Sequence, residues 1–190
     1  MTTTKGLLER APNKEYVAND YFSDMEKDYV YKARLQILKH HFGGILIIKK
    51  IENNHHRVVF TTEFGNKLFD LEFINDDFKV NYVLDKLNKK FILNMLEQDF
   101  QTLISQNNKV EHQFSSELED IFQSNTEKYQ NYYVFSKQTG ELNKIISASK
   151  NKEKLIITFL VTEKGISSSI KLIHKKFNAM MDLNYIGKTD

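Results

Sequence analysis

The fold is decided between residues 29 and 84, and this stretch opens with the segment YVYKARLQIL, Tyr29 to Leu38. Apolar or aromatic residues dominate alternate positions, so one face of an extended strand carries Tyr29, Tyr31, Ala33, Leu35 and Ile37. The other face carries Lys32, Arg34 and Gln36. A strand with one apolar and one polar face is typical of an antiparallel sheet that covers a core on one side.

The same alternation continues along the chain and predicts four further strands. They cover residues 43–51, 57–62, 67–73 and 78–84, and short turns separate them. Strands that follow one another through short turns pair as an antiparallel meander. Five more strands are expected later in the chain, at residues 132–136, 142–149, 154–161, 169–175 and 179–186.

Between the two groups of strands the apolar residues recur every three or four positions, which is the period of a helix. Residues 88–104 place Ile92, Met95, Leu96, Phe100 and Leu103 on one stripe, with Glu97, Gln98 and Gln101 opposite. Shorter helices are expected at residues 15–27 and 115–123. The predicted fold class is therefore α+β: a strongly curved antiparallel sheet, a half-barrel of about ten strands, whose concave face is covered by helices.

The length of 190 residues and the composition predict one globular domain. Residues 1–14 are polar, carry the only proline and are expected to form a flexible N-terminal arm, while residues 15–190 form the domain. The formal net charge of +2 is too small for a dedicated nucleic-acid binder, so no nucleic-acid partner is expected. The absence of cysteine excludes thiol nucleophiles, disulfides and cysteine metal sites.

No residue pattern in the chain predicts an enzyme active site. The sequence contains no phosphate-binding loop, no dinucleotide-binding glycine fingerprint and no nucleophile elbow. Two histidine pairs, at residues 40–41 and 55–56, follow the first predicted strand and precede the third, so they fall at opposite ends of the sheet. A shared metal ion is therefore not expected, and the chain is predicted to be non-enzymatic, with no cofactor and no metal.

Two turns at one edge of the predicted meander differ from the others because they carry phenylalanine. They contain Phe42, followed by Gly43, and Phe64, followed by Gly65, whereas the turns at the opposite edge contain no aromatic residue. A phenylalanine exposed at a turn gains about 2 kcal/mol when it enters a bilayer or a partner's pocket. Phe42, Phe64 and Gly65 are therefore candidate membrane- or partner-contacting residues, and the alternative is that each ring folds back over the core.

The stretch RVVFTTEFG, Arg57 to Gly65, resembles the strand and turn of the LolB family of outer-membrane lipoprotein receptors, in which a proline-leucine-glycine turn follows an arginine and an apolar strand. Glu63 stands where that family usually has proline, and the family's tryptophans are absent. The similarity covers most of the chain and extends to the wider LolA and LolB fold family of lipoprotein carriers. Its further segments are residues 31–34, 89–104, 133–161, 169–172 and 181–186.

The resemblance implies a non-enzymatic protein that binds acyl chains of a lipoprotein or lipid in an apolar cavity, for lipoprotein transfer to or insertion into the outer membrane. The family's protruding apolar turn residue, which promotes membrane delivery, aligns with Phe64. The alternative is a structural or interaction domain of the same fold, with a filled core and no lipid cargo. The candidates for lining the apolar cavity are Leu35, Ile37, Leu46, Ile48, Val59, Phe69, Leu71, Met95 and Phe100.

The resemblance also implies a cellular location and partners. It implies a lipid-anchored monomer on the periplasmic face of the outer membrane of a Gram-negative bacterium, in peripheral contact with that membrane. Its partners would be a lipid or an acylated lipoprotein, together with a periplasmic carrier protein. Because the family's anchor cysteine is absent from this chain, residues 1–14 are interpreted as a remnant after a removed leader.

Overall fold

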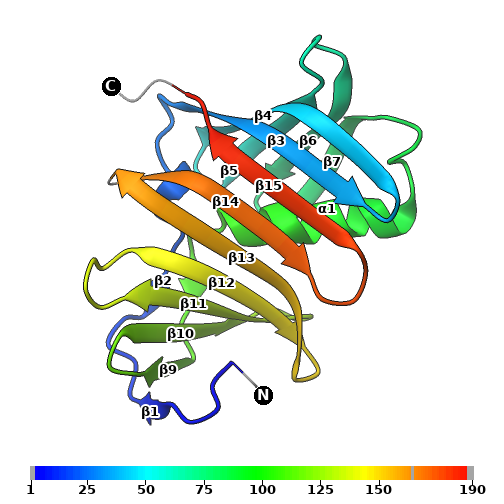
Figure 1. The fold of residues 1–190 in the computed structure, drawn as a ribbon. Coiled ribbons are helices and arrows are strands. Elements are labelled where there is room, and N and C mark those ends of the chain that lie inside the picture. The colour runs from blue at the N-terminus through cyan, green and yellow to red at the C-terminus, as the bar shows by residue number, and fades with distance from the viewer. Residues whose placement is uncertain (1–2, 164, 188–190) are drawn as a thin grey trace.

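Thirteen strands form one antiparallel sheet that curls but does not close (Figure 1). The computed structural model describes residues 3–163 and 165–187 of the chain. The order of strands across the sheet is β1-β9-β10-β11-β12-β13-β14-β15-β3-β4-β5-β6-β7. Strands β1 and β7 are therefore the two edges of the sheet, and the two halves of the chain meet where β15 pairs with β3.

Two meanders make up this sheet, and helix α1 (Lys90–Ile104) connects them. The first consists of β3 (Asp28–Ile37), β4 (His40–Glu52), β5 (His55–Thr61), β6 (Lys67–Ile74) and β7 (Asp77–Val83). The second consists of β9 (His112–Ser115), β10 (Glu119–Asn125), β11 (Gln130–Ser136), β12 (Leu142–Ser149), β13 (Lys152–Glu163), β14 (Ile166–His174) and β15 (Ala179–Tyr185). Strand β1 (Leu8–Arg10) pairs with β9, and β2 (Tyr16–Val17) pairs with β8 (Asn108–Lys109) in a separate small sheet.

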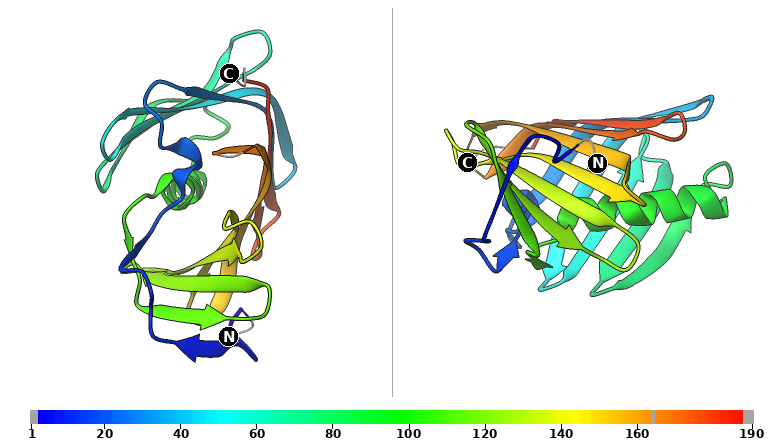
Figure 2. Two further views of the ribbon diagram at one scale, coloured as in Figure 1. Left: turned by 90° about the vertical axis from the view of Figure 1, so that its left-hand side faces the viewer. Right: turned by 90° about the horizontal axis from the view of Figure 1, so that it is seen from below.

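The curve of the sheet encloses α1. In the left view of Figure 2 the helix is seen end-on, with the first meander above it and the second below it. The segment that precedes β3 is tied to the C-terminal end of the helix, because the Asn19 side chain donates through Nδ2 to the carbonyl of Leu103 at 2.6 Å. The helix therefore occupies the concave side of the sheet and is held at its far end by the N-terminal part of the chain.

The helix expected at residues 88–104 is confirmed as α1, and each of the ten expected strands has a counterpart in the structure. The predicted fold class is nevertheless wrong. Strands contain 57% of the residues and helix contains 10%. The large sheet has thirteen strands, and α1 is the one α-helix of the described residues. The concave face is thus occupied by a single helix and not covered by several.

The two other expected helices are wrong for a physical reason. Within residues 115–123, Ile121 packs on the outer face of the sheet and Phe122 on the inner face. A strand that is buried on both faces does not alternate between apolar and polar residues, so its sequence pattern resembles that of a helix. Within residues 15–27 the chain forms β2 and the short 3-10 helix η1 (Asp20–Phe22), which inserts Tyr21 and Phe22 into the core.

The inner face of the sheet is packed with aromatic rings. Phe69 lies 5.4 Å from Phe60 and 5.9 Å from Phe100, measured between ring centroids, and Phe73 lies 6.3 Å from Phe100. Rings at these separations and tilted to one another form favourable edge-to-face contacts. Because Phe100 belongs to α1 and the others to β5 and β6, this cluster joins the helix to the first meander.

A smaller apolar cluster lies on the opposite, outer face of β10–β13. Leu7, from the segment predicted as a flexible arm, packs against it, and Thr3 donates from Oγ1 to Oε1 of Glu153 at 2.7 Å. The same segment continues into β1 at the sheet edge. The second meander is therefore buried on both faces of the sheet. The buried members of the outer cluster are Ile121, Tyr132, Val134, Ile146 and Ala148.

Gly44→Ala is expected to destabilise the fold by about 2 kcal/mol, because there is no room for a side chain where β4 lies beside the end of β5. A Cβ atom at Gly44 would clash with the backbone carbonyl of Thr61, whereas a Cβ at the neighbouring Gly43 would meet open space. Urea denaturation of both variants tests this directly. Gly43→Ala is the matched control, and equal midpoints for the two variants would contradict the expectation.

Candidate functional site

The turn between β5 and β6 displays a phenylalanine to solvent. The Thr62 amide donates to the Asn66 carbonyl at 2.8 Å, and the Gly65 amide donates to the Thr62 carbonyl at 2.9 Å. Gly65 has φ +83°, a left-handed conformation that glycine adopts without strain. The closed turn leaves Phe64 93% exposed, so the ring makes little contact with the rest of the protein.

Phe42, the other candidate of this edge, behaves differently. It is half-buried and packs against the core cluster, with the ring of His40 6.4 Å away between centroids. The turn position predicted for Phe42 is wrong, because Phe42 lies in β4 opposite Leu35 of β3. Of the two candidates, Phe64 alone is therefore available in full to a membrane or partner, while Phe42 packs over the core.

The hairpin that carries Phe64 is anchored on the outer face of the sheet by a charged network. Asp70 accepts hydrogen bonds from Nε and Nη2 of Arg57 at 2.9 and 2.8 Å and from Nζ of Lys67 at 2.8 Å. Glu72, one pleat further along β6, accepts from Asn81 at 3.1 Å and lies 2.8 Å from Nε2 of His55. These contacts link β5, β6 and β7 along the length of the hairpin, from Lys67 beside the turn to His55 at the opposite end.

The network makes stability depend on pH. The Arg57 guanidinium holds the pKa of Asp70 well below its usual range, and hydrogen bonds from Asn81 and His55 lower the pKa of Glu72 to about 2. A carboxyl whose folded-state pKa is lowered stabilises the fold above its unfolded-state pKa, and that stability is lost as pH falls through the folded-state pKa. The free energy of unfolding is therefore expected to fall between about pH 5 and pH 2.

Asp70→Asn is expected to remove about 2 kcal/mol of stability at pH 7 and to flatten the acid dependence. Urea midpoints at pH 7 and pH 3 measure both effects. Asp182→Asn is the matched control, because its carboxylate lies 3.4 Å from Lys171 in a more exposed pair on the same sheet. An Asp70→Asn variant with the wild-type acid dependence would contradict the assignment.

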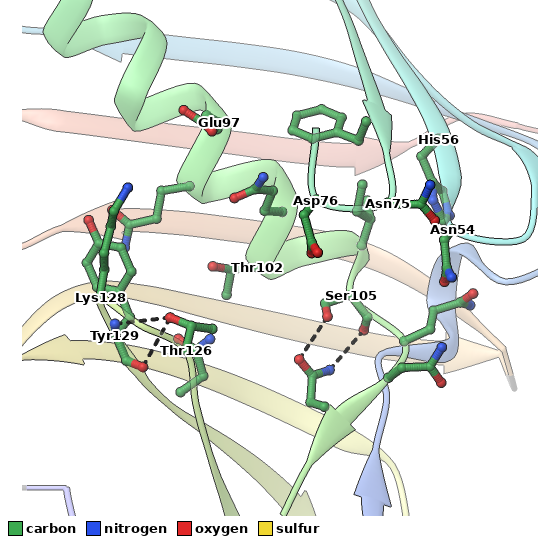
Figure 3. A pocket seen from close by; sticks show the side chains of 18 of the residues that line it. Asn54, His56, Asn75, Asp76, Glu97, Thr102, Ser105, Thr126, Lys128 and Tyr129 are labelled. Atoms are coloured by element: carbon green, nitrogen blue, oxygen red, sulfur yellow. Dashed lines mark hydrogen bonds between the residues drawn. The ribbon is translucent and has the colours of Figure 1, made fainter. Parts of the chain in front are cut away.

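A large cavity runs along the polar side of α1 (Figure 3). Its volume is about 920 Å³. The β4–β5 and β6–β7 turns form one side, with Asn54 and Asp76, and the β10–β11 turn forms the other side, with Lys128 and Tyr129. The helix contributes Asn94, Glu97, Gln98, Gln101 and Thr102. This groove is mostly polar, with Phe73 and Ile104 as apolar exceptions.

A smaller cavity of about 420 Å³ adjoins the first near the start of α1. The two share Asn94, Gln98 and Tyr129 as lining residues. Apolar side chains line part of the smaller cavity, lysines from the β12–β13 and β14–β15 hairpins line another part, and Ser149 and His174 also contribute. The apolar residues are Phe91, Met95 and Phe177, and the lysines are Lys150, Lys154 and Lys176.

Eight of the nine predicted cavity residues face the core, and most are packed there without contact to either cavity. Leu46, Ile48, Phe69, Leu71 and Phe100 are fully buried, and Leu35 and Ile37 nearly so. Met95 is buried and also lines the smaller cavity. Val59 is the exception, because it is half-buried on the outer face, while its neighbours Val58 and Phe60 point inward.

Sequence reasoning missed most of the residues that line the cavities. Gln98 and Gln101 were expected on the solvent side of the helix, and the structure places them in the groove instead. The helical pattern already separated these residues from the apolar stripe, but it does not show that the β10–β11 turn faces them. The segment 105–108, which closes one end of the groove, carried no recognisable motif.

One buried ion pair fastens α1 to the second meander. Nε2 of His174, at the end of β14, lies 2.9 Å from the carboxylate of Asp99, and both side chains are almost completely buried. Burial raises the pKa of Asp99, and the hydrogen bond with His174 opposes that rise. A weaker polar contact, Nε2 of Gln98 to Oγ of Ser147 at 3.3 Å, lies nearby.

The two histidine pairs, at residues 40–41 and 55–56, lie at opposite ends of the paired strands β4 and β5. Nε2 of His56 lies 3.1 Å from the carbonyl of Phe22, His55 lies beside Glu72, and His40 begins β4. Within residues 3–163 and 165–187, no group of three or more metal-ligating side chains is placed to hold a metal ion. No helix in the described part of the chain combines the length and apolar character needed to cross a bilayer.

The fold and the site define a class of protein: an open, curled antiparallel sheet around one helix, with cavities beside the helix and an aromatic turn at the rim. The structure is similar to that of a LolA superfamily protein from Nitrosomonas europaea, with a TM-score of 0.57 over 88% of each chain. The two sequences are 10% identical. The chain thus has the fold of the LolA and LolB family, and this likeness does not distinguish LolB from other members.

Two further solved structures are more distant. A DUF1329 family protein from Desulfovibrio piger has a TM-score of 0.47 at 8% identity, over 84% of each chain. A domain from Vibrio parahaemolyticus, assigned provisionally to outer membrane lipoprotein sorting, has a TM-score of 0.45 at 9% identity, over 88% of this chain and 86% of that one. No family model and no curated protein matches the sequence.

Proposed function

We propose that this protein is a non-enzymatic carrier or receptor that binds acyl chains of a lipid or lipoprotein between α1 and the concave face of the sheet. One observation carries the proposal: the apolar concave face is occupied by a single helix that has solvent-open cavities along it. The LolA superfamily fold supports the same conclusion. The smaller cavity provides the entrance, because its apolar side chains are continuous with the core through Met95.

The free energy lost when α1 is released from the sheet is similar in size to the free energy gained when an acyl chain is buried in its place. Six apolar side chains of α1 are buried, and releasing them from the sheet would cost about 9–18 kcal/mol at about 1.5–3 kcal/mol each. An acyl chain of about sixteen carbons gains about 12 kcal/mol at about 0.8 kcal/mol per buried methylene. A helix that shifts and repacks against the acyl chain at a cost of about 4 kcal/mol or less would leave about 8 kcal/mol, which corresponds to micromolar binding.

Phe64 supplies the membrane contact in this proposal. Its exposed ring lies on a rigid turn, at the end of the first meander where α1 begins. Insertion of the ring into a bilayer would place the mouth of the smaller cavity near the lipid surface. We extend the proposal to a LolB-like role: a lipid-anchored monomer at the periplasmic face of a Gram-negative outer membrane, receiving lipoproteins from a periplasmic carrier protein.

A second candidate function is an interaction domain with no lipid cargo. The observation in its favour is the filled core, because Phe60, Phe69 and Phe73 of the concave face already pack against Phe100 of α1 and one another. In that case the polar groove along α1 would contact another protein and the helix would stay in place.

Displacement of a fluorescent fatty acid separates the two functions. The carrier proposal expects saturable, micromolar binding that strengthens about tenfold for every two methylenes added to the competitor, because each methylene leaves water. Adsorption to the surface would show no such increase, and absence of binding up to the solubility limit of the ligand would leave the interaction domain as the better conclusion.

A further inference from the structure

The smaller cavity gathers positive charge from two hairpins. Lys150 comes from the β12–β13 turn, Lys154 from the start of β13, and Lys176 from the β14–β15 turn. None of the described residues that line this cavity carries a carboxylate. The nearby Asp99 is buried and paired with His174, and Glu153 lies opposite Ala148 on the outer face of the sheet, so neither lies among the lysines.

The backbone is irregular at two of these lysines, Lys154 and Lys150. The β12–β13 pairing shifts register between Ser147 and Ala148, and this irregularity leaves Lys154 without a partner residue in β12 while it lines the cavity. Such bulges redirect side chains. Lys150 has φ 52° in the tight turn that it forms with Asn151, a conformation that costs a lysine about 1–2 kcal/mol.

The lysines are also close enough to affect one another. The proximity of Lys176 lowers the pKa of Lys154, and the charges of Lys152 and Lys150 lower it further. Like charges held together repel, and a bound anion relieves that repulsion. On the other side of the cavity, Phe91, Met95 and Phe177 offer apolar surface that a simple inorganic anion would leave unused.

We propose that this cavity binds the phosphate or carboxylate group of an amphiphilic anion, with Lys150, Lys154 and Lys176 around the charged group and the alkyl chain directed along Met95 toward the core. The part played by the alkyl chain rests on the proposed acyl-binding function, whereas the anion site does not. The site thus selects negatively charged amphiphiles over neutral ones.

Calorimetric titration with dodecyl phosphate, monolaurin (a neutral ester of the same chain length) and inorganic phosphate tests this. The variant is Lys154→Gln with Lys176→Gln, and the matched control is Lys144→Gln with Lys171→Gln, which removes the same charge from the outer face of the same sheet. The cavity variant is expected to weaken dodecyl phosphate binding by about tenfold or more and to leave monolaurin binding within about twofold. The control is expected to change neither.

The outcomes separate the two proposals. If monolaurin binds and both variants bind dodecyl phosphate like the wild type, the anion site is wrong and acyl binding stands. If inorganic phosphate binds and depends on the cavity lysines while neither amphiphile binds more tightly than phosphate, the anion site stands as a free-phosphate site and acyl binding fails. If none of the three ligands binds, both proposals are overturned.

Discussion

Asp99→Ala is expected to lower the free energy of unfolding by about 3–5 kcal/mol, because it removes one partner of a buried ion pair. His174 would keep its buried position beside Phe177, whose ring is 4.7 Å away between centroids, but would lose the carboxylate that lies 2.9 Å from Nε2. Because this pair joins α1 to β14, the helix should also loosen, and acyl ligands should enter faster. Urea denaturation and stopped-flow binding of a fluorescent fatty acid measure the two effects.

Two further variants control for the loss of a buried charge. Asp99→Asn keeps a hydrogen-bonding partner for His174 and should cost clearly less than Asp99→Ala. Glu97→Ala removes a carboxylate that lines the groove two positions earlier in the helix, and it should change stability little. If Asp99→Ala were no more destabilising than Glu97→Ala, the ion pair would not be what fastens the helix to the second meander.

Phe64→Glu is expected to abolish binding to liposomes, with a loss of about thirtyfold or more and no change in the urea midpoint. A ring that is 93% exposed contributes little to folding, but its transfer into a bilayer gains about 2 kcal/mol, and a carboxylate there is unfavourable. Sedimentation with anionic liposomes gives the partition coefficient, and circular dichroism confirms that the fold is intact.

Leu118→Glu is the matched control for this variant. Leu118 is an exposed apolar residue between β9 and β10, in a turn of the second meander. The substitution Leu118→Glu changes the net charge by the same amount as Phe64→Glu. It should leave liposome binding close to that of the wild type. An equal loss for both variants would mean that Phe64 has no special role, and unchanged binding of Phe64→Glu would remove it from the membrane-contact proposal.

The long strands of the first meander follow from local pattern, and β10 shows where that pattern fails. Alternation predicts β3 because Tyr29, Tyr31 and Ala33 all face one buried side. It fails at β10, where Ile121 and Phe122 are buried on opposite faces, because a second apolar cluster lies outside the sheet. That cluster depends on Leu7 and on strands far along the chain, so a local window does not contain it.

The candidate site was less predictable than the fold because its residues meet only through tertiary structure. Phe64 was identified from turn position alone, since a strand pattern determines which turns share an edge. Asp99 and His174 are 75 positions apart, and nothing in either segment indicates the other. The cavity lysines likewise belong to two hairpins, and a small irregularity in β13 directs one of them inward.

Photo-crosslinking tests most directly whether acyl chains enter between α1 and the sheet. A fatty acid with a photoreactive group at its methyl end would be bound, irradiated and located by peptide mass spectrometry. We expect crosslinks on the concave face and the apolar stripe of the helix, at Leu46, Leu71, Met95 or Phe100. Crosslinks confined to the outer face, at residues such as Ile47 and Val59, or to exposed surface residues would contradict it.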